Sequence, residues 1–491
     1  MLQAALSARL LRADTAFGDE ALYLYAGHLE WAYWLHGYNS VYRAAFPSWF
    51  SGSPVIYPPL GAIADSLGGL LAARLLSLGF MLGVTTCLYG VASRLLDRRA
   101  GLFAAFIFVM IAPTQDLGAF ATYDAMALSL LAFATWIGVV AAGLRIGPRV
   151  VLLATSGAVI VLADATKYAT TLWSPVAIVV IATAAWQARG FRPGLYAGAT
   201  VFGAWTIALA SALAWGGRVY WRGILQTTLA RSTSSAPASA VLHQSFTLIG
   251  LVLILAIFGA IASIGADART RVLCCTAVFA VLLAPLNQAR IHTTVSLHKH
   301  VDFGAWFAAI AAGYLLSRIS KIDARRGWCT AVVAIIAVPG LLASFGEAGL
   351  WASYWPNTTK MVAALRPLAK PTGGQYLFEE FDVGYYYLHS DVYPGQLQNM
   401  FGFLYWDQRR HILLSGPPAF RLAITNHYFN LIEVDGQNIS KPTTKAIEHS
   451  LASTRGYRLV FKQPWGPSDS AGPAHGYIEI WRLVTRRGKA S

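Results

Sequence analysis

Residues 71–96 read LAARLLSLGFMLGVTTCLYGVASRLL, an apolar run that ends just before the basic pair Arg98-Arg99. A helix needs about 20 mostly apolar residues to cross the roughly 30 Å hydrocarbon core of a bilayer, and this run supplies them. It is the first of about ten segments that we predict to be membrane-spanning helices. These segments are Leu71–Leu96, Leu102–Pro113, Tyr123–Leu144, Val150–Lys167, Thr170–Trp186, Leu195–Trp215, Phe246–Ile264, Val272–Leu286, Phe303–Leu316 and Trp328–Phe345.

The composition of the whole chain agrees with this pattern. Of its 491 residues 56% are hydrophobic and only 12% are charged, and the mean hydropathy is +0.50. Such values exclude a fibrous protein, a disordered protein and a small disulfide scaffold. The formal net charge is +15, but most basic residues lie between apolar runs, which is typical of membrane loops. We therefore expect membrane lipids, and no nucleic acid, among the partners.

Charge also orients the predicted helices, because Lys and Arg collect in the cytoplasmic loops of membrane proteins. Every second connection of this chain is basic. The five basic connections, which we expect in the cytoplasm, contain Arg94, Arg98 and Arg99; Arg145 and Arg149; Arg189 and Arg192; Arg269 and Arg271; and Arg318, Lys321, Arg325 and Arg326. The others are expected outside: the N-terminal stretch with a first loop at about 13–57, the connection near Gln115, the turn at Lys167-Tyr168, the loop 216–244 and the segment 287–302.

The chain is predicted to form two domains. Residues 1–348 are expected to be an all-α polytopic membrane domain. Residues 349–491 gain Asn, Gln, His, Pro and charged residues, which predicts a small water-soluble α/β domain on the extracytoplasmic side. In this domain we expect helices at Thr358–Leu368 and Thr443–Thr454 and strands at Tyr376–Phe381, Arg458–Phe461 and Tyr477–Val484.

The first residues of the sequence need a separate interpretation. Met1–Leu11 is apolar but too short to span a bilayer, and Arg9 and Arg12 lie close to its end. Because the charge pattern places Asp19 outside, we expect a further spanning helix upstream of this sequence. The alternative is a helix on the membrane surface.

Polar residues of both signs fall on the predicted outer face, where a carboxylate can deprotonate an acceptor and cations can hold a departing phosphate. This pattern predicts a site for a phosphorylated lipid and a hydroxyl acceptor. Its members are Asp19, Glu20, Asp124, Lys167, Arg290, His292, His298, Lys299 and His300. The spacing of the histidines does not match a zinc site, and the sequence has no Walker loop or dinucleotide fingerprint.

Each of these residues also has a purely structural interpretation, which stays open here. Asp19-Glu20 could cap a helix, and so could Thr122 or Asp124. Lys167 could lie along the membrane interface with Asp164 as its partner. The stretch 296–307, SLHKHVDFGAWF, could be an exposed basic loop, although three adjacent bases beside a membrane helix carry a desolvation cost that a phosphate would offset.

Four stretches of the sequence resemble a known family. They are residues 15–28, TAFGDEALYLYAGH; residues 53–96, which begin SPVIYPPL; residues 121–133, ATYDAMALSLLAF; and residues 166–175, TKYATTLWSP. In this order they are similar to the integral-membrane GT-C glycosyltransferases, in the polyprenyl-phosphate-sugar-dependent branch that includes protein O-mannosyltransferases and aminoarabinose transferases of lipid A. The resemblance covers about residues 15–316.

The resemblance implies roles for the residues of the outer face. Asp19 would be the general base, with Glu20 orienting the substrate, and Asp124 matches a second acidic position. Lys167 and the run His298, Lys299 and His300 would bind the lipid phosphate, and Tyr57–Leu60 would be the turn into the next membrane helix. On the same outer face, we also expect Tyr168 and Arg290 to bind substrate. Asp19, Glu20 and Asp124 are also candidate ligands for a divalent cation.

The predicted function is therefore that of a multi-pass cell-membrane glycosyltransferase. It would transfer a hexosyl or pentosyl group with inversion from a polyprenyl-phosphate donor to a lipid, glycan or protein acceptor outside the cytoplasm. The alternative from another class is a transporter or flippase of a lipid-linked sugar, which the number of helices alone permits. A third possibility is a membrane scaffold without catalytic activity that binds envelope polymers.

Overall fold

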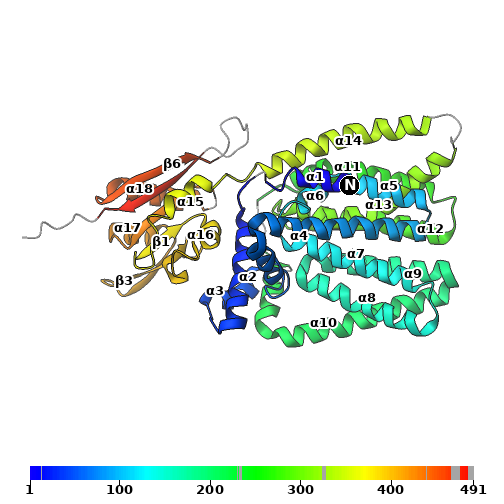
Figure 1. Ribbon diagram of the computed structural model, residues 1–491, viewed down its shortest axis with the longest axis horizontal. Coiled ribbons are helices and arrows are strands. Elements are labelled where there is room, and N and C mark those ends of the chain that lie inside the picture. Colours follow the sequence, from blue (N-terminus) through cyan, green and yellow to red (C-terminus); the bar gives the residue numbers. More distant parts are fainter. Residues whose placement is uncertain are drawn as a thin grey trace, which may run out of the picture. The chain divides into compact units, whose positions relative to one another are not determined.

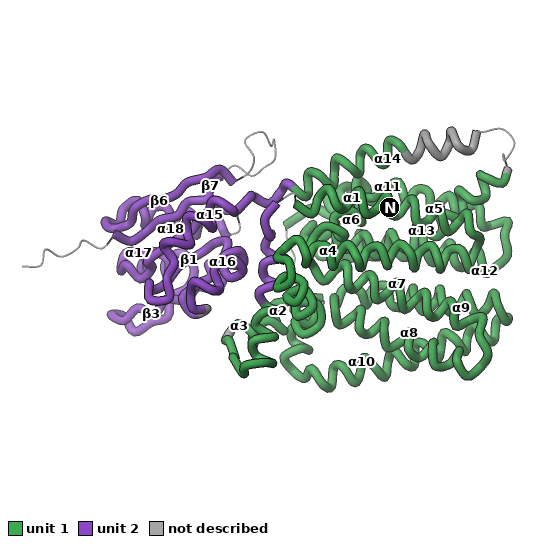
Figure 2. Tube along the Cα trace, viewed as in Figure 1, with its two compact units in different colours: residues 1–12, 26–352 green, residues 13–25, 353–491 purple. Residues whose placement is uncertain are grey.

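The computed structural model describes residues 1–12, 14–228, 230–231, 235–322, 328–437, 439–465 and 476–484. The chain divides into two compact units (Figure 2). The helical unit comprises residues 1–12 and 26–352, and the C-terminal unit comprises residues 13–25 and 353–491. The second boundary lies close to the predicted residue 349, but residues 13–25, which we had assigned to the membrane domain, belong to the C-terminal unit.

The helical unit is a bundle of long helices joined by short connections (Figure 1). Each of the ten predicted segments overlaps one of its helices. Their bounds are α4 Tyr57–Leu95, α5 Arg98–Met110, α7 Tyr123–Ala141, α8 Ile146–Thr166, α9 Ser174–Arg189, α10 Phe191–Thr227, α11 Ala238–Ala262, α12 Ala268–Arg290, α13 Leu297–Ile322 and α14 Trp328–Ala352. Shorter elements complete the bundle: α1 Leu2–Ala8, α3 Val41–Trp49, α6 Ala112–Leu117 and the 3₁₀ helix η1 Tyr168–Leu172, while α2 Gly18–His36 begins in the C-terminal unit.

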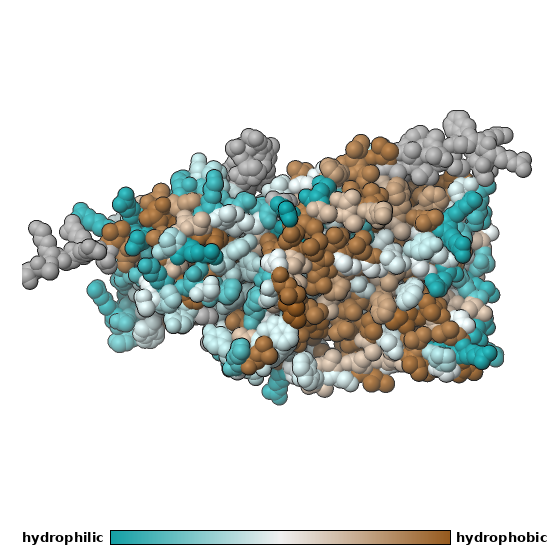
Figure 3. All heavy atoms as spheres, in the orientation of Figure 1, coloured by the Kyte–Doolittle hydropathy of each residue, from teal (hydrophilic) through white to brown (hydrophobic). Residues whose placement is uncertain are grey.

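Seven of the described helices are long and apolar enough to cross a membrane, namely α4, α7, α8 and α10 to α13. Two of the predicted spans, α5 and α9, have only 13 and 16 residues. Hydrophobic residues dominate the visible face of the helical unit, and Figure 3 shows them in brown between the ends of the helices. The predicted polytopic α-helical membrane domain is confirmed.

Helix α4 begins earlier than the predicted Leu71. Pro58 and Pro59 lie at its first positions, where the missing N–H groups interrupt no helical hydrogen bond. The helix is then broken at Gly68 and Gly69, and Gly69 has a φ of +65°. The predicted segment is thus the second part of α4, and the YPPL turn opens the first part.

The basic connections that the charge pattern assigned to one side do lie together at one end of the bundle. Arg189, at the end of α9, donates hydrogen bonds to the carbonyl oxygens of Ala142 and Leu144, which follow α7 (3.1 and 2.6 Å). Lys321, at the end of α13, pairs with Asp97 before α5 at 2.8 Å. Arg325 and Arg326 lie outside the described residues.

The other connections meet at the opposite end. The backbone N–H of Tyr168, after α8, donates to the carbonyl of Ser51 at 2.8 Å, and that of Ala236, before α11, donates to the carbonyl of His292 at 3.2 Å. The alternation of basic and non-basic loops in the sequence therefore corresponds to the two ends of a real helical bundle.

The C-terminal unit is a small α/β domain, as predicted. Its five-stranded sheet has the order β2-β1-β5-β7-β6, in which β1 is parallel to β2 and β5 and β7 is antiparallel to β5 and β6. The strands are β1 Gln375–Phe378, β2 Leu397–Asn399, β5 Phe429–Val434, β6 Tyr457–Pro464 and β7 Tyr477–Leu483, and β3 Leu404–Asp407 pairs with β4 Ile412–Ser415. The helices are α15 Thr359–Leu365, α16 Phe381–Leu388, α17 Gly416–Thr425, α18 Lys441–Ser453 and the 3₁₀ helix η2 Pro394–Gln396.

All five predicted elements of this domain are present, with ends shifted by a few residues. A core of residues such as Leu377, Phe420, Ile432 and Ile447 packs between the sheet and its helices. The prediction missed α16, α17 and the short strands β2 to β5.

Candidate functional site

A buried ion pair joins two of the predicted site residues in the helical unit. Asp124 lies in the first turn of α7, and Lys167 directly follows α8. The two side chains form a salt bridge, and both residues are almost fully buried, with exposures of 0% and 2%. The second oxygen of Asp124, Oδ2, is buried and accepts no hydrogen bond from the part of the chain that the structure describes. Desolvating two charges is costly, and such buried pairs add little net stability.

The basic run on α13 lies close to this pair. Lys299 and His300 interact electrostatically with Asp124, and so does His298. His300 is further hydrogen-bonded through Nδ1 to the side-chain amide of Gln288, and the ring of His298 stacks on Trp351 of α14 with centroids 4.5 Å apart. The interpretation of residues 296–307 as an exposed loop is wrong for Lys299 and His300, which are buried in the first turn of a helix.

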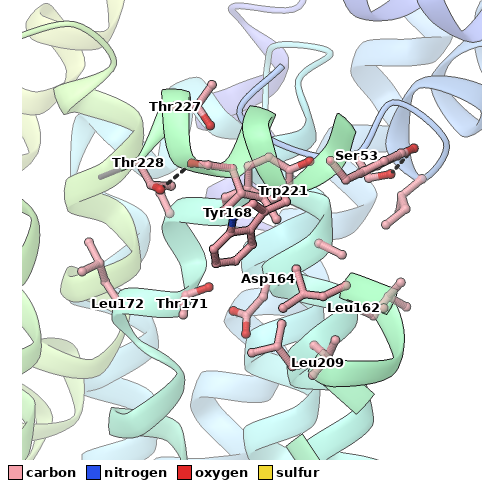
Figure 4. Close-up of a pocket in the computed structure, with 18 of the residues that line it drawn as sticks. Ser53, Leu162, Asp164, Tyr168, Thr171, Leu172, Leu209, Trp221, Thr227 and Thr228 are labelled. Atoms are coloured by element: carbon pink, nitrogen blue, oxygen red, sulfur yellow. Dashed lines mark hydrogen bonds between the residues drawn. The ribbon is translucent and has the colours of Figure 1, made fainter. Parts of the chain in front are cut away.

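A large cavity of about 760 Å³ opens beside this group. Helices α8 and α10 contribute an apolar part of its wall: Ala158, Val161, Leu162, Leu209, Ala212, Leu213, Trp215 and Ile224. The lining also includes polar and basic side chains, among them Asp164, Tyr168, Arg231, Asn287, Gln288, Arg290 and His300. Figure 4 shows Leu162 and Leu209 beside Asp164 at one end of the view, and Trp221, Thr227 and Thr228 at the other.

Three predicted substrate-binding residues therefore line one cavity: Tyr168, Arg290 and His300. The hydroxyl of Tyr168 is buried and has no hydrogen-bond partner among the described residues. Arg231 interacts electrostatically with His300, at the start of α13, and both residues line the cavity together with Arg290. An apolar channel that ends in cations and an unpaired hydroxyl is suited to a ligand with a long apolar tail and an anionic head.

The predicted pairing of Lys167 with Asp164 is wrong. Asp164 lies on α8, and its carboxylate accepts hydrogen bonds from Ser174 Oγ and Trp205 Nε1, both at 2.8 Å. Residues three positions apart lie on the same face only while the helix continues. Lys167 is the first residue after α8 and has an extended backbone, so its side chain does not lie beside that of Asp164. Lys167 turns to Asp124 instead.

The cavity owes part of its wall to a break in α10. Gly217 has a φ of +64° and a ψ of −160°, which residues with a Cβ rarely adopt. Beyond it, residues 218–227 run on in a new direction and bring Tyr220, Trp221 and Ile224 to the cavity.

The backbone at Gly52 approaches the carbonyl of Thr166 so closely that a Cβ would lie 2.0 Å from that oxygen.

The sequence analysis missed Arg231, Tyr220 and Trp221 as members of the site. Arg231 is a basic residue in a connection assigned to the outside, where the charge pattern gives no reason for one. The stretch WGGRVYWRG at residues 215–223 breaks an apolar run with two glycines and continues with aromatic residues. Both features were visible signals.

The other two predicted catalytic residues, Asp19 and Glu20, belong to the C-terminal unit and start α2. Glu20 is fully buried, and its Oε2 accepts a hydrogen bond from the backbone N–H of Phe17 at 3.3 Å. This contact is one half of a capping box, so the capping interpretation is correct for Glu20. Asp19 is half-buried, and its carboxylate interacts electrostatically with that of Asp382 on α16.

Burial and the nearby carboxylate of Asp19 hold the pKa of Asp382 well above its usual range. Within the described ranges, no three His, Cys, Asp or Glu side chains are arranged to hold a metal ion. The predicted role of Asp19, Glu20 and Asp124 as ligands of a divalent cation therefore has no geometric support among the described residues.

Comparison with solved structures gives the fold a precedent. ArnT from Cupriavidus metallidurans bound to undecaprenyl phosphate matches 98% of this chain and 97% of its own, with a TM-score of 0.60 and 12% identity. The archaeal oligosaccharyltransferase AglB from Archaeoglobus fulgidus, in complex with an inhibitory peptide and a dolichol-phosphate, matches 97% of this chain and 75% of its own, with a TM-score of 0.56 and 11% identity. No family model and no curated protein sequence matches the chain.

Identities this low establish the fold alone. They show that the chain has the architecture of these two membrane proteins over nearly its whole length. The GT-C fold that the sequence resemblance implied is confirmed.

Proposed function

We propose that this protein is a membrane glycosyltransferase that moves a sugar from a polyprenyl-phosphate donor to an acceptor at the extracytoplasmic face. The observation that carries the proposal is the cavity of the helical unit, in which an apolar wall from α8 and α10 leads to Arg231, Arg290 and His300. Its two chemical halves match the two halves of a lipid phosphate. Burying the apolar tail away from water stabilises the complex, and so do charge-assisted hydrogen bonds to the phosphate.

The fold neighbours support this choice of ligand. ArnT is described with undecaprenyl phosphate and AglB with a dolichol-phosphate, so two proteins of this architecture hold a polyprenyl phosphate. A transporter would also need to bind such a lipid, but the resemblance of residues 15–28 to the acidic motif of glycosyltransferases favours transfer.

In the proposed reaction, Asp19 takes the proton of the acceptor hydroxyl as general base. The acceptor oxygen then attacks the anomeric carbon on the side opposite the phosphate. A new glycosidic bond forms, the bond between this carbon and the phosphate oxygen breaks, and the configuration inverts. The cations of the helical unit stabilise the charge that develops on the departing lipid phosphate.

The buried pair of Asp124 and Lys167 has a supporting part in this proposal. With Lys299 it forms a charged group whose desolvation has already taken place during folding, so its field is oriented before the donor arrives. We assign Lys167, Lys299 and His300 to the donor phosphate, and Tyr168 and Arg290 to the donor as lining residues of the cavity.

The test is mass spectrometry of lipid-linked sugars in cells that lack the protein. We expect one polyprenyl-phosphate sugar to accumulate, and its mass would identify the sugar. Wild-type protein should remove the accumulated lipid, whereas Asp19→Asn should not, since it loses the base and nearly keeps the shape. Asp391→Asn is the matched control, because Asp391 pairs with Arg366 on the surface of the C-terminal unit.

Unchanged lipid-linked sugars, with expression and insertion confirmed, would refute the transferase. Near wild-type turnover by Asp19→Asn would refute the role of Asp19 alone. Transport of the lipid-linked sugar across vesicles without a new glycosidic bond would favour the flippase.

A further inference from the structure

We propose that the C-terminal domain holds the acidic motif Asp19-Glu20 in place for the transfer reaction, with Thr358 and Tyr387 as positioning residues. This inference rests on the proposed function, because it assigns these residues to the same reaction. It starts from the division of α2 between the two units. Residues 13–25 belong to the C-terminal unit, whereas α2 from Ala26 onward belongs to the helical unit (Figure 2).

Hydrogen bonds tie the chain just before Asp19 to the C-terminal domain. The hydroxyl of Thr15 lies 2.8 Å from that of Thr358, and it accepts the backbone N–H of Thr358 at 3.0 Å. The backbone N–H of Ala16 donates to the hydroxyl of Tyr387 at 3.0 Å. These bonds are made four and three residues before Asp19, by residues that lie more than 300 positions away in sequence.

Packing continues the contact along the motif. The ring of Phe17 meets Trp355 edge to face, with centroids 6.3 Å apart. At Gly18, a Cβ would lie 3.4 Å from Oδ2 of Asp382 in α16. Farther on, Tyr25 stacks on Tyr385 at 5.2 Å with an angle of 12° between the rings.

The contacts are buried, which makes them specific. Ala16, Thr358, Tyr25 and Tyr385 are each at most 2% exposed. The backbone N–H of Ala16 bonds to Tyr387, and that of Phe17 bonds to Glu20. A buried N–H that lost its partner would carry the full cost of desolvation, so the chain on the N-terminal side of Asp19 has one strongly preferred path.

A general base needs such a fixed path. The rate of a proton transfer or displacement falls about a hundredfold when the reacting groups are misplaced by roughly 1 Å. Asp19 lies on the first turn of a helix whose start is held by Thr358 and Tyr387, so the orientation of its carboxylate depends on these residues. Thr358 and Tyr387 would then contribute to the turnover rate without touching the substrate.

The experiment uses the full-length protein in detergent with the polyprenyl-phosphate sugar extracted from cells lacking the protein, and with an envelope extract of the same cells as the source of the acceptor hydroxyl. Tyr387→Phe removes only the hydroxyl that receives the N–H of Ala16. We expect kcat to fall about tenfold or more, while KM for the lipid donor changes less than about twofold, because the donor cavity is unaltered.

Two matched comparisons separate positioning from general damage. Tyr457→Phe removes a hydroxyl that donates to the carbonyl of Phe429 at 2.8 Å within the same domain, and it should leave kcat unchanged. Thr15→Val removes the hydroxyl that meets Thr358 and should lower kcat, whereas Thr15→Ser keeps a hydroxyl and should restore it. Hydrogen–deuterium exchange should be faster in residues 13–25 of Tyr387→Phe than in those of Tyr457→Phe.

Each result decides the matter. A loss of kcat in Tyr387→Phe and Thr15→Val, with Thr15→Ser active and residues 13–25 exchanging faster, supports the inference. Wild-type kcat in Tyr387→Phe, or equal losses in Tyr387→Phe and Tyr457→Phe, overturns it while the proposed function stands. If the wild-type protein does not consume the lipid, the proposed function fails, and the inference fails with it even if exchange shows that residues 13–25 are held.

Discussion

At the scale of single residues, variants of Asp124 and Lys167 can show whether this ion pair serves the donor site or only stabilises the fold. Lys167→Met leaves the buried carboxylate of Asp124 without its ion pair. We expect a loss of about 3–5 kcal/mol in the free energy of unfolding, as for other broken buried pairs. The double variant Asp124→Asn/Lys167→Met should recover most of this loss, since neither charge of the pair then stays buried without its partner. The measurement is thermal unfolding in detergent, combined with the transfer assay.

The double variant separates the two interpretations of the pair. If both residues serve the donor site, it should be stable and inactive. A double variant that is stable and transfers sugar at the wild-type rate would show that the pair is only structural.

Four buried carboxylates of the C-terminal domain give a prediction about pH. Glu379 and Glu380 follow β1, Glu433 is the last residue but one of β5, and Asp435 follows that strand; all four are less than 10% exposed. Burial and the neighbouring carboxylates raise the pKa of Asp435 to about 8 and those of Glu380 and Glu433 well above their usual range. The folded state therefore binds more protons than the unfolded state, and stability should fall as pH rises from about 4 towards 8.

Asp435→Asn should flatten this dependence, because it removes one titrating group from the cluster. The measurement is hydrogen–deuterium exchange of the peptides that cover β1 and β5 in the full-length protein, corrected for intrinsic exchange rates at each pH. An equally steep loss of protection in the variant and the wild type would contradict the assignment to Asp435.

At the scale of elements, the groove between α8 and α10 is the part of the cavity that would receive the lipid tail. Ala212→Trp fills this groove, whereas Ala210→Trp on the same helix places the same ring on an exposed position outside the cavity. We expect Ala212→Trp to weaken the binding of undecaprenyl phosphate about tenfold or more, which corresponds to about 1.4 kcal/mol, and Ala210→Trp to leave it unchanged. Native mass spectrometry in detergent measures both affinities. Equal affinities for the two variants would show that the lipid tail does not bind in this groove.

Elements of this bundle were largely predictable, because a membrane helix must be apolar over its whole length. The ten segments were found for that reason, and their ends were set by basic residues such as Arg98 and Arg189. Breaks inside a helix were not predictable with the same rule. Gly69 and Gly217 turn α4 and α10 without changing hydropathy, so the start of α4 and the aromatic wall of the cavity were missed.

The candidate site was predictable in part. Asp124, Lys167 and Lys299 were expected on one face because their helices end on the same side, and they do lie together. Partner choice depends on side-chain direction at a helix end, which spacing does not determine, and so Lys167 was assigned to Asp164 instead of Asp124. The connection of Asp19 to the C-terminal domain depends on Thr358 and Tyr387, whose spatial partners no local pattern in the sequence indicates.

At the scale of the whole molecule, the charge pattern predicts the orientation in the membrane. The connections with Arg189 and Arg269 lie at one end of the helical unit, where the side chain of Arg269 reaches the carbonyl of Gln187 at 3.4 Å. Because Lys and Arg collect on the cytoplasmic side, this end should face the cytoplasm, and the C-terminal domain should lie outside. Single cysteines can test both statements in a variant whose four native cysteines are replaced by serine. We expect a membrane-impermeant maleimide to label the exposed position of Lys360→Cys in intact cells, and Arg192→Cys only after the membrane is opened. Labelling of Arg192→Cys alone in intact cells would reverse the orientation and move the proposed transfer to the cytoplasmic face.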